Sequence, residues 1–536
     1  MKHLYSFLLS ALVCLSLSAQ NKVSGDSLAA DFHYLVKQLE AAHPDPYTGF
    51  GGKVFFHKQA FDLENELRSQ PHTLQEFWDK SMAFLSFIQD GHTYLFSLAS
   101  KQQQEQSYLP VGFRCIPDGL IVQSLPAAHQ DLLGSLLVGI NGKSMDELLA
   151  RTASLFACEN LYNRYSVFCR NVVRRQFMQQ LLPDLEDTVC FYLRTPDGKD
   201  VTLEQHFMEN EELRKAEKVN LPSWVGCPEE QMAYRFIDKK KEVMMFKVNS
   251  IMARDNFEYM YKHMKGDLLR QMEFYYQSAL KKEMPADTLQ AIRALPSFSG
   301  TFAAMLKEMK KHHSEYLIID LRGNSGGWTP IVLASLYQLY GDKYLQKDMD
   351  TEYYRIVSPL YMNKLEITLE EFNRSYGTDY SFGDYTFSMK EQEDIPLDTL
   401  RRQFIDGCMS SVKEELRAQK GAPVYAPKQV FVVTDERTFS AAFHYAFMLW
   451  KMGATVVGVP SGQAPNTFME QTLFKLPYTG IEGSISNSVQ IFLPGKDKRA
   501  KTFWPDVMLT YDEYKQTGFD KQAEILFLLN KIGQEK

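Results

Sequence analysis

The sequence predicts an α/β protein in which a helical N-terminal region and a small β-rich module precede a larger core of strands and helices. Three observations support this class. Apolar residues recur at helical spacing through residues 25–98, and short strand-like runs separated by turn signals fill residues 106–205. Buried strands then alternate with helical segments over residues 240–345 and again from residue 425 onward, which is typical of a parallel sheet covered by helices.

The chain is too long for one hydrophobic core, because single cores stop growing near roughly 250 to 300 residues and this chain has 536. Its division is expected to be a signal peptide over 1–19, a helical domain over 20–105, a β module over 106–210 and an α/β domain over 235–536. Within the last domain, two segments near 255–300 and 345–425 are rich in charge, tyrosine and methionine, and we expect them to be insertions.

The N-terminus has the three parts of a signal peptide. Lys2 precedes a mostly apolar run at 7–17, and small residues at Ser16, Ser18 and Ala19 offer a cleavage site. The apolar run is shorter than the roughly 20 residues of a membrane span, and no later segment of the sequence is long and apolar enough to cross a bilayer. The mature protein is therefore expected to be periplasmic, secreted or peripherally attached to the cell envelope.

Composition and residue spacing argue against several classes of function. The formal net charge is −7 and there is no long basic run, so nucleic-acid binding is not expected. The spacings Cys-x-x-Cys and His-Glu-x-x-His are absent from the sequence, so we predict no metal site and no cofactor. Six cysteines follow the signal peptide; an oxidising compartment favours disulfides, but spacing alone does not decide which of them pair.

The helical region ends in a turn that carries a histidine. Residues 84–91 predict a helix that stops at Gly91, since glycine lets the backbone leave a helix. His92 and Thr93 follow, and a short apolar strand is expected over 94–96. On its own, His92 fits a packed turn residue at a domain boundary as well as it fits a functional one.

The β module contains a turn, Ile-Asn-Gly-Lys-Ser at 140–144, followed by a helix-like segment at 145–149. This arrangement resembles a PDZ domain. PDZ domains bind an extended peptide by adding it as a strand to their sheet, so the resemblance implies a module that captures substrate. The alternative is a packing module without a groove.

Two strand ends in the α/β domain carry unusual residues. At 320–327 an apolar strand breaks into Asp-Leu-Arg-Gly-Asn-Ser-Gly-Gly. Glycines let backbone N–H groups face outward, so such a loop can hold an oxyanion or a phosphate. The Gly-Lys-Ser/Thr of a phosphate loop does not follow. A plain strand-to-helix turn is the other interpretation.

The second strand end is the segment 434–442, where Ser440 stands between a buried strand and a helix. A helix N-terminus stabilises developing negative charge, and the N–H of Ala441 can contribute to an oxyanion hole. The same position also suits a helix N-cap, which either Thr438 or Ser440 could provide.

Taken together, these motifs resemble the tail-specific (C-terminal processing) serine proteases. The segment 320–327 is similar to their Asp-Leu-Arg-x-Asn-x-Gly-Gly motif, and the segments 438–442 and 456–458 are similar to their nucleophile region. The segments 462–468, 476–477 and 504–507 resemble their closing region. The resemblance spans nearly the whole mature chain apart from the insertions. It implies a crotonase-like (ClpP-like) catalytic core with Ser440 as the nucleophile.

The family is known with either a lysine or a histidine as the base. The lysine position here falls in the segment 461–467, which contains no lysine, whereas Gly91-His92-Thr93 resembles the tricorn-like, histidine-dependent branch. A histidine pKa near 6.5 suits proton transfer near neutrality. His444, one helical turn after Ser440, is a weaker candidate. Members of this branch carry a Glu before the Pro-Asp of the closing region, but here Phe503 and Trp504 occupy that stretch. The resemblance therefore implies no carboxylate partner for His92. Asp90, in the same turn as His92, is an alternative partner.

The expected function is that of an exported serine endopeptidase acting on peptides or unfolded proteins. Ser440 attacks, His92 transfers the proton, and the N–H groups of Ala441 and of Gly326 or Gly327 hold the oxyanion. The missing Glu supports an alternative, a weakly active or inactive homologue that binds peptides or ligands. A crotonase-type enzyme acting on thioesters fits the core but not the signal peptide. Nothing in the sequence indicates an oligomeric state.

Overall fold

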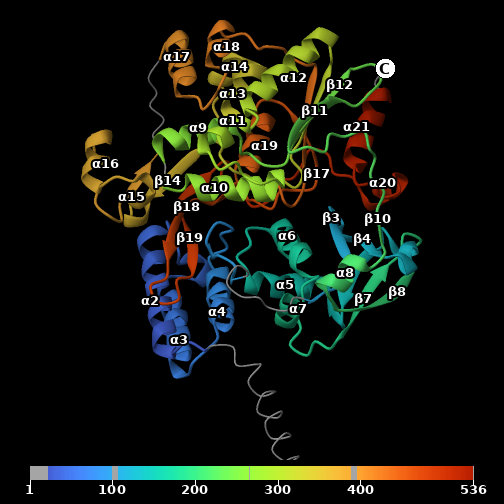
Figure 1. Cartoon of the computed structure of the whole chain (residues 1–536), viewed down its shortest axis with the longest axis vertical. Helices are drawn as coiled ribbons and strands as arrows, with labels where there is room; N and C mark the ends of the chain where they lie inside the picture. Colours follow the sequence, from blue (N-terminus) through green and yellow to red (C-terminus); the bar gives the residue numbers. More distant parts are fainter. Residues whose placement is uncertain (1–21, 99–106, 265, 350, 388–394, 535–536) are drawn as a thin grey trace, which may run out of the picture.

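The computed structural model describes residues 22–98, 107–264, 266–349, 351–387 and 395–534 (Figure 1). The predicted signal peptide, residues 1–19, lies outside them. Across the described ranges, no helix combines the length and apolar character that a membrane span requires. The fold is of the mixed α/β type, as the alternation of strands and helices predicts.

A five-stranded sheet forms the centre of the α/β region. Its order is β11-β12-β13-β16-β17; β11 runs antiparallel to β12 and the other neighbours are parallel. The strands span Met232–Phe236, Val243–Val248, Tyr316–Asp320, Gln429–Thr434 and Thr455–Gly458. Every residue of β13 is buried, as expected for a parallel strand covered on both faces.

Helices cover one face of this sheet, and a helix with part of the β module covers the other. On the first face Phe246, Ile319 and Val432 pack against helices α12, α13 and α19, which span Phe298–His312, Pro330–Tyr340 and Ala441–Lys451. On the second face Ile318 and Val433 pack against Ile121 of the β module and against α21, Ala523–Gln534. The β module is therefore fixed to the core by shared apolar contacts.

The N-terminal region is helical, as predicted. Its helices are α2, Gly25–Ala42, α3, Lys53–Ser69, and α4, Leu74–Ser86, with a short 3-10 turn at Thr48–Phe50. Thr73 and Glu76 form a capping box at the start of α4. The helix ends at Ser86, before the predicted stop at Gly91, because Gln89 takes a left-handed conformation with φ of +56°. Strand β1, Tyr94–Leu95, follows His92.

The β module contains a seven-stranded antiparallel sheet with the main order β10-β4-β5-β7-β8. These strands span Lys218–Asn220, Gly119–Pro126, Leu136–Ile140, Thr188–Arg194 and Asp200–His206, and β3, Gly112–Ile116, and β6, Lys143–Ser144, pair at its side. Helix α5, Met145–Leu155, begins at the predicted turn and is capped by Ser144 and Glu147. The sequence did not predict the two helices that follow, α6, Leu161–Asn171, and α7, Arg175–Leu181.

A second sheet joins the two ends of the chain. Strand β19, Glu482–Ile491, pairs with β18, Asn466–Lys475, along one edge, and with β14, Glu352–Ile356, and β1 along the other. Figure 1 shows the orange-red β18–β19 hairpin reaching the blue N-terminal helices. Phe474 and Ile485 of the hairpin are buried in the same cluster as Phe32 and Phe84. The hairpin thus brings β1, and His92 beside it, to the core.

The two predicted insertions contain helices attached to the core. The first holds α9, Arg254–His263, α10, Leu268–Tyr275, and α11, Thr288–Ala294, which form their own apolar cluster with Trp328 at its edge. The second holds β14 with β15, Tyr385–Phe387, and four short helices, Pro359–Leu365, Leu369–Tyr376, Leu397–Gly407 and Lys413–Ala418.

Candidate active site

Ser440 occupies a strained turn between strand β16 and helix α19. Its φ and ψ are 51° and −127°, and α19 begins at the next residue, Ala441. A non-glycine residue with positive φ is uncommon and costs free energy, and such residues cluster at functional sites. The Ser440 side chain does not cap the helix in the described structure. The capping interpretation of this serine is therefore not supported by its geometry.

The backbone N–H of Ser440 donates a hydrogen bond to Oε1 of Gln463. Gln463 is fully buried and belongs to the segment where the lysine-dependent relatives would carry their base. Here the segment instead contributes an amide oxygen that fixes the backbone beside the serine. The sequence showed that this segment contains no lysine, but it did not predict the hydrogen bond between Gln463 and Ser440.

Gly326 packs directly against Ser440. A Cβ at this glycine would lie 2.6 Å from Ser440 Cβ and 2.9 Å from Ala441 N, and φ is +107°. Only a glycine fits both the close approach and the backbone conformation. The N–H of Gly326 donates to Oδ1 of Asn324 at 2.9 Å, and Asn324 in turn donates to the carbonyl of Val248 at 2.9 Å. Asn324, another residue whose role the sequence did not reveal, therefore holds the glycine loop in place.

The backbone N–H groups of Ala441 and Gly327 are free to bind an oxyanion, whereas that of Gly326 already donates a hydrogen bond. Neither N–H has a hydrogen-bond acceptor among the described residues, whereas the flanking Ser440 and Gly326 amides are both occupied. The carbonyl of Gly326 accepts from Ile251 N at 2.8 Å, which orients the peptide between the two glycines. Two free donors thus remain in the two segments that flank Ser440.

His92 lies in the turn between α4 and β1. Its carbonyl accepts a hydrogen bond from Ser484 Oγ at 2.6 Å, so the β18–β19 hairpin fixes this turn. His92 is only 6% exposed, and neither ring nitrogen has a hydrogen bond of good geometry within the described residues, although the backbone of Phe468 lies close enough to raise the pKa of the imidazole. The ring packs on Phe439, the residue before Ser440, with centroids 4.9 Å apart. The turn predicted from sequence therefore meets the nucleophile-like segment.

Two buried carboxyl groups flank this imidazole. Asp90 Oδ1 and Glu159 Oε1 each lie 3.8 Å from His92 Nδ1. Asp90 also contacts His43 Nε2 at 3.3 Å and accepts from His92 N at 2.8 Å. Glu159 comes from the β module, and its proximity to His92 was not predicted. Only folding of the module against the N-terminal region brings it here.

The protein environment shifts the pKa values of His92, Asp90 and Glu159 in different directions. Burial lowers the pKa of His92, although the charge of Asp90 and the backbone of Phe468 partly oppose this, so the imidazole is neutral near pH 7. Burial alone would raise the pKa of Asp90, but the hydrogen bond and charge of His43 lower it to about 2. Burial, with the Asp90 charge nearby, raises the pKa of Glu159 to about 8.

Asp90, His92 and Glu159 could also offer metal ligands. One atom from each lies within 4.8 Å of the others, and in the described part of the chain this is the one group of three with such spacing. Both carboxyl groups already accept hydrogen bonds from backbone N–H groups: that of His92 in the case of Asp90, and those of Gly91 and Ala464 in the case of Glu159. The donor set is compatible with a divalent ion, and the absence of a metal site remains a prediction.

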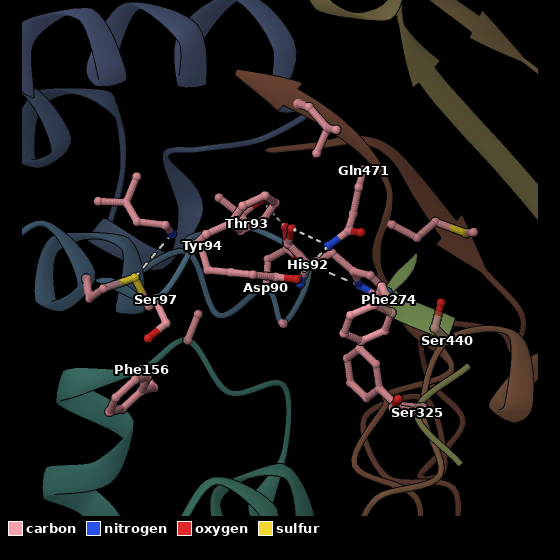
Figure 2. A pocket seen from close by; sticks show the side chains of 18 of the residues that line it. Asp90, His92, Thr93, Tyr94, Ser97, Phe156, Phe274, Ser325, Ser440 and Gln471 are labelled. Carbon is pink, nitrogen blue, oxygen red and sulfur yellow. Dashed lines mark hydrogen bonds and ion pairs between the residues drawn. The ribbon is translucent and has the colours of Figure 1, made fainter. Parts of the chain in front are cut away.

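Ser440 and His92 line a single cavity of about 2410 Å³. Figure 2 shows them as they enter it from different elements, with Asp90 and Thr93 beside His92. The cavity is also lined by Ser325 and Gly327 of the glycine loop and by residues of α7 and α10. The predicted residues are thus brought to one cavity, although the ring of His92 is not hydrogen-bonded to Ser440.

His444, the weaker candidate, is held in a closed network. Gln490 donates to the carbonyl of Pro465 at 3.0 Å, so its Oε1 faces His444 Nε2 at 2.8 Å and accepts from it. Nδ1 then accepts from the hydroxyl of Thr329, also at 2.8 Å. Burial lowers the pKa of His444 to about 4. Both nitrogens are committed, so this histidine is poorly placed to accept a proton from Ser440.

The closing region contributes packing and a backbone contact. Phe503 is buried in a cluster with Phe443 and Phe447, and Trp504 packs edge-on against Tyr162. The carboxylate of Asp506 accepts from Val456 N at 2.8 Å, which ties this region to β17.

Comparison with known proteins agrees with this architecture. Residues 291–482 match peptidase family S41. No curated protein sequence matches the chain. The crystal structure of mature CPAF is 14% identical, aligns over 95% of this chain and 98% of its own length, and has a TM-score of 0.54. The structure of mature CPAF complexed with lactacystin aligns over 94% and 97%, with 14% identity and a TM-score of 0.53. The matched residues include the glycine loop, the Ser440 turn and the first part of the hairpin, so this part of the chain is similar to peptidase family S41.

Proposed function

We propose that this protein is an exported serine endopeptidase of the histidine-dependent, tricorn-like branch, which cleaves peptide bonds through an acyl-enzyme on Ser440. The observation that carries the proposal is the strained turn at Ser440, which faces the same cavity as a buried, unpartnered His92. An imidazole that burial keeps neutral is able to accept the serine proton.

In the proposed first step, the Ser440 hydroxyl attacks the substrate carbonyl and His92 takes its proton. The free N–H groups of Ala441 and Gly327 hold the negatively charged oxygen that forms, and the Gly326 N–H supports the loop through Asn324. His92 then gives the proton to the leaving amine, and the bond to that amine breaks. In the second step, water attacks the acyl carbonyl while His92 takes its proton, and His92 gives that proton to the Ser440 oxygen as the ester bond breaks.

The proposed mechanism needs His92 to meet Ser440 within roughly 3 Å when substrate is bound. Catalytic hydrogen bonds are often looser in a substrate-free enzyme and tighten in the complex. The Phe439 ring lies against the imidazole, so movement of the imidazole toward Ser440 would be accompanied by a shift of this ring. Substrate in the shared cavity would favour that arrangement.

The domain assignments form part of the proposal. The five-stranded sheet with its helices would be a crotonase-like core over 235–536, with insertions near 255–300 and 345–425. Residues 20–105 would be a helical cap, and residues 106–210 a PDZ-like module. The antiparallel sheet and the capped helix α5 support a module that presents an extended peptide to the cavity.

Labelling with a fluorophosphonate tests the nucleophile. We expect wild-type protein to be modified at Ser440, and the Ser440→Ala variant to lose both labelling and peptide cleavage while remaining folded. The His92→Ala variant should lose cleavage to a similar degree, because the serine then has no base. An unlabelled wild-type protein, tested beside a known serine hydrolase that reacts, would remove the main support for a peptidase.

A second candidate function is peptide or ligand binding without turnover. It is favoured by the lack of a hydrogen bond between His92 and Ser440 and by Phe503 and Trp504, which stand where the branch carries a Glu. This candidate predicts saturable peptide binding with equal affinity in wild-type protein and in the Ser440→Ala variant, with no cleavage by either.

A further inference from the structure

Glu159 joins two segments that are far apart in the sequence and adjoin the candidate site. It is located between helices α5 and α6 of the β module and is 7% exposed. Its Oε1 accepts from the N–H of Gly91 at 3.3 Å, and its Oε2 accepts from the N–H of Ala464 at 2.8 Å. One carboxyl group therefore holds the N-terminal turn and the segment before β18 together.

Each of these segments holds one member of the proposed dyad: the first contains His92, and the second binds the backbone of Ser440. Gly91 directly precedes His92, and Oε1 of Glu159 lies 3.8 Å from His92 Nδ1. Ala464 directly follows Gln463, whose side chain accepts the N–H of Ser440. A displacement of the Glu159 carboxyl would thus change the position of the imidazole relative to the serine backbone. Small displacements matter, because misplacing reacting groups by about 1 Å can lower a rate about 100-fold.

We propose that Glu159 is a positioning residue for the peptidase reaction, an acidic brace that fixes His92 relative to Ser440 from the β module. The inference rests on the proposed function. It assigns the missing orienting role to a carboxyl group from a part of the chain far from the closing region, where Phe503 and Trp504 stand. It also makes the β module a structural component of the active site.

Asp31 provides a matched control. It is a fully buried carboxyl group that accepts two backbone N–H bonds, from Tyr478 at 2.8 Å and Thr479 at 2.7 Å. It too joins an N-terminal segment to a C-terminal one, but at the turn of the β18–β19 hairpin. Neither carboxyl group lines the cavity, and Glu159 differs from Asp31 in lying 3.8 Å from His92 Nδ1. Loss of either carboxyl group should weaken the fold, whereas only loss of Glu159 should alter the site.

The experiment compares Glu159→Ala, Glu159→Gln and Asp31→Asn in the full chain. Active sites are counted by fluorophosphonate labelling carried to completion, folding is followed by thermal unfolding, and kcat and KM are measured on an unstructured peptide. We expect Glu159→Ala to lower kcat per active site about 100-fold with KM within about twofold of wild type. Glu159→Gln keeps one acceptor oxygen and should recover part of the loss, and Asp31→Asn should keep the wild-type kcat.

The outcomes separate this inference from the proposed function. Wild-type kcat in a folded Glu159→Ala protein, or an equal fall in kcat for Asp31→Asn, overturns the positioning role and leaves the peptidase intact. If Glu159→Ala does not fold, the Glu159→Gln variant provides the test. A kcat for that variant equal to the wild-type value contradicts the positioning role. A wild-type protein that neither reacts with the probe nor cleaves peptide overturns both proposals.

Discussion

At the scale of single residues, the backbone of Ser440 is the feature with the clearest energetic consequence. A non-glycine residue in such a conformation costs about 1–3 kcal/mol, and glycine would relieve most of this cost. The Ser440→Gly variant should therefore unfold at a higher temperature than wild type while losing all labelling and cleavage. Ser440→Ala keeps Cβ and the strain, so its stability should stay close to that of wild type. Equal melting temperatures for the two variants would contradict strain at this position.

Gly326 gives a second prediction at this scale. A methyl group there would contact Ser440 Cβ and the Ala441 amide at distances too short for carbon, and the positive φ adds strain. We expect Gly326→Ala to lower the rate of fluorophosphonate labelling at least about 100-fold, because it displaces the nucleophile by a sizeable fraction of 1 Å. Gly323→Ala is the control, since Gly323 also has positive φ but has open space around its Cβ position. It should lose stability but keep its labelling rate.

His444 makes folding depend on pH. Its pKa is about 4 in the folded protein and about 6.5 in an unfolded chain. The unfolded state therefore binds the proton first, and the free energy of unfolding falls as the pH drops from about 6.5 to about 4. At about 1.4 kcal/mol for each pKa unit, the loss from this group is about 3 kcal/mol. Urea unfolding at pH 7 and pH 4 should show this loss in wild type, and His444→Gln should remove that part of the pH dependence.

At the scale of elements, the β18–β19 hairpin connects the core to the N-terminal helices. Phe474 is buried among those helices, whereas its neighbour Leu473 is 41% exposed. Truncating a buried Phe costs about 3–5 kcal/mol, so Phe474→Ala should lower the free energy of unfolding by that amount. It should also reduce peptide cleavage, because the hairpin holds the His92 turn through Ser484. Leu473→Ala, measured in parallel, should change stability by less than about 0.5 kcal/mol.

The sequence predicted the elements that have strong local signals. The apolar runs at β12, β13, β16 and β17 are strands, and the segment before Ser440 leads from a strand into a helix as expected. It did not predict helices α6 and α7 or the place of the hairpin. The hairpin's contacts with α2 and α4 join residues from opposite ends of the chain, and local periodicity carries no information on such contacts. For the same reason Glu159 and Gln463 escaped notice, since each lacks a motif and acts only through its position in space.

At the scale of the whole molecule, a buried ion network connects three regions. Glu524 of α21 accepts from Arg114 of the β module at 2.8 Å and from Arg322 of the glycine loop at 2.7 Å. Arg322 also pairs with Asp320 at 2.9 Å, and Lys247 pairs with Asp320 at 3.0 Å. Burial would raise the pKa of Glu524, but the charges of Arg114 and Arg322 lower it. The network therefore keeps an ionised carboxylate inside the protein.

Removing that carboxylate leaves the buried guanidinium of Arg114 without its carboxylate partner, and leaves Arg322 paired with Asp320 alone. Breaking a buried pair costs about 3–5 kcal/mol, so Glu524→Gln should lower the free energy of unfolding by that amount in urea. Glu370 pairs with Arg374 on the surface, and exposed pairs contribute about 0–1 kcal/mol. Glu370→Gln is thus the control, and a similar loss in both variants would mean that the network contributes no more than a surface pair.

The β18–β19 hairpin also has a consequence for biosynthesis. It completes the hydrophobic core of a domain whose helices are made first, so those helices wait with apolar surface uncovered until residue 491 has been synthesised. His92 and Ser440 come to line one cavity only after this late docking. During translation the growing chain therefore lacks the assembled dyad that the proposed peptidase mechanism requires.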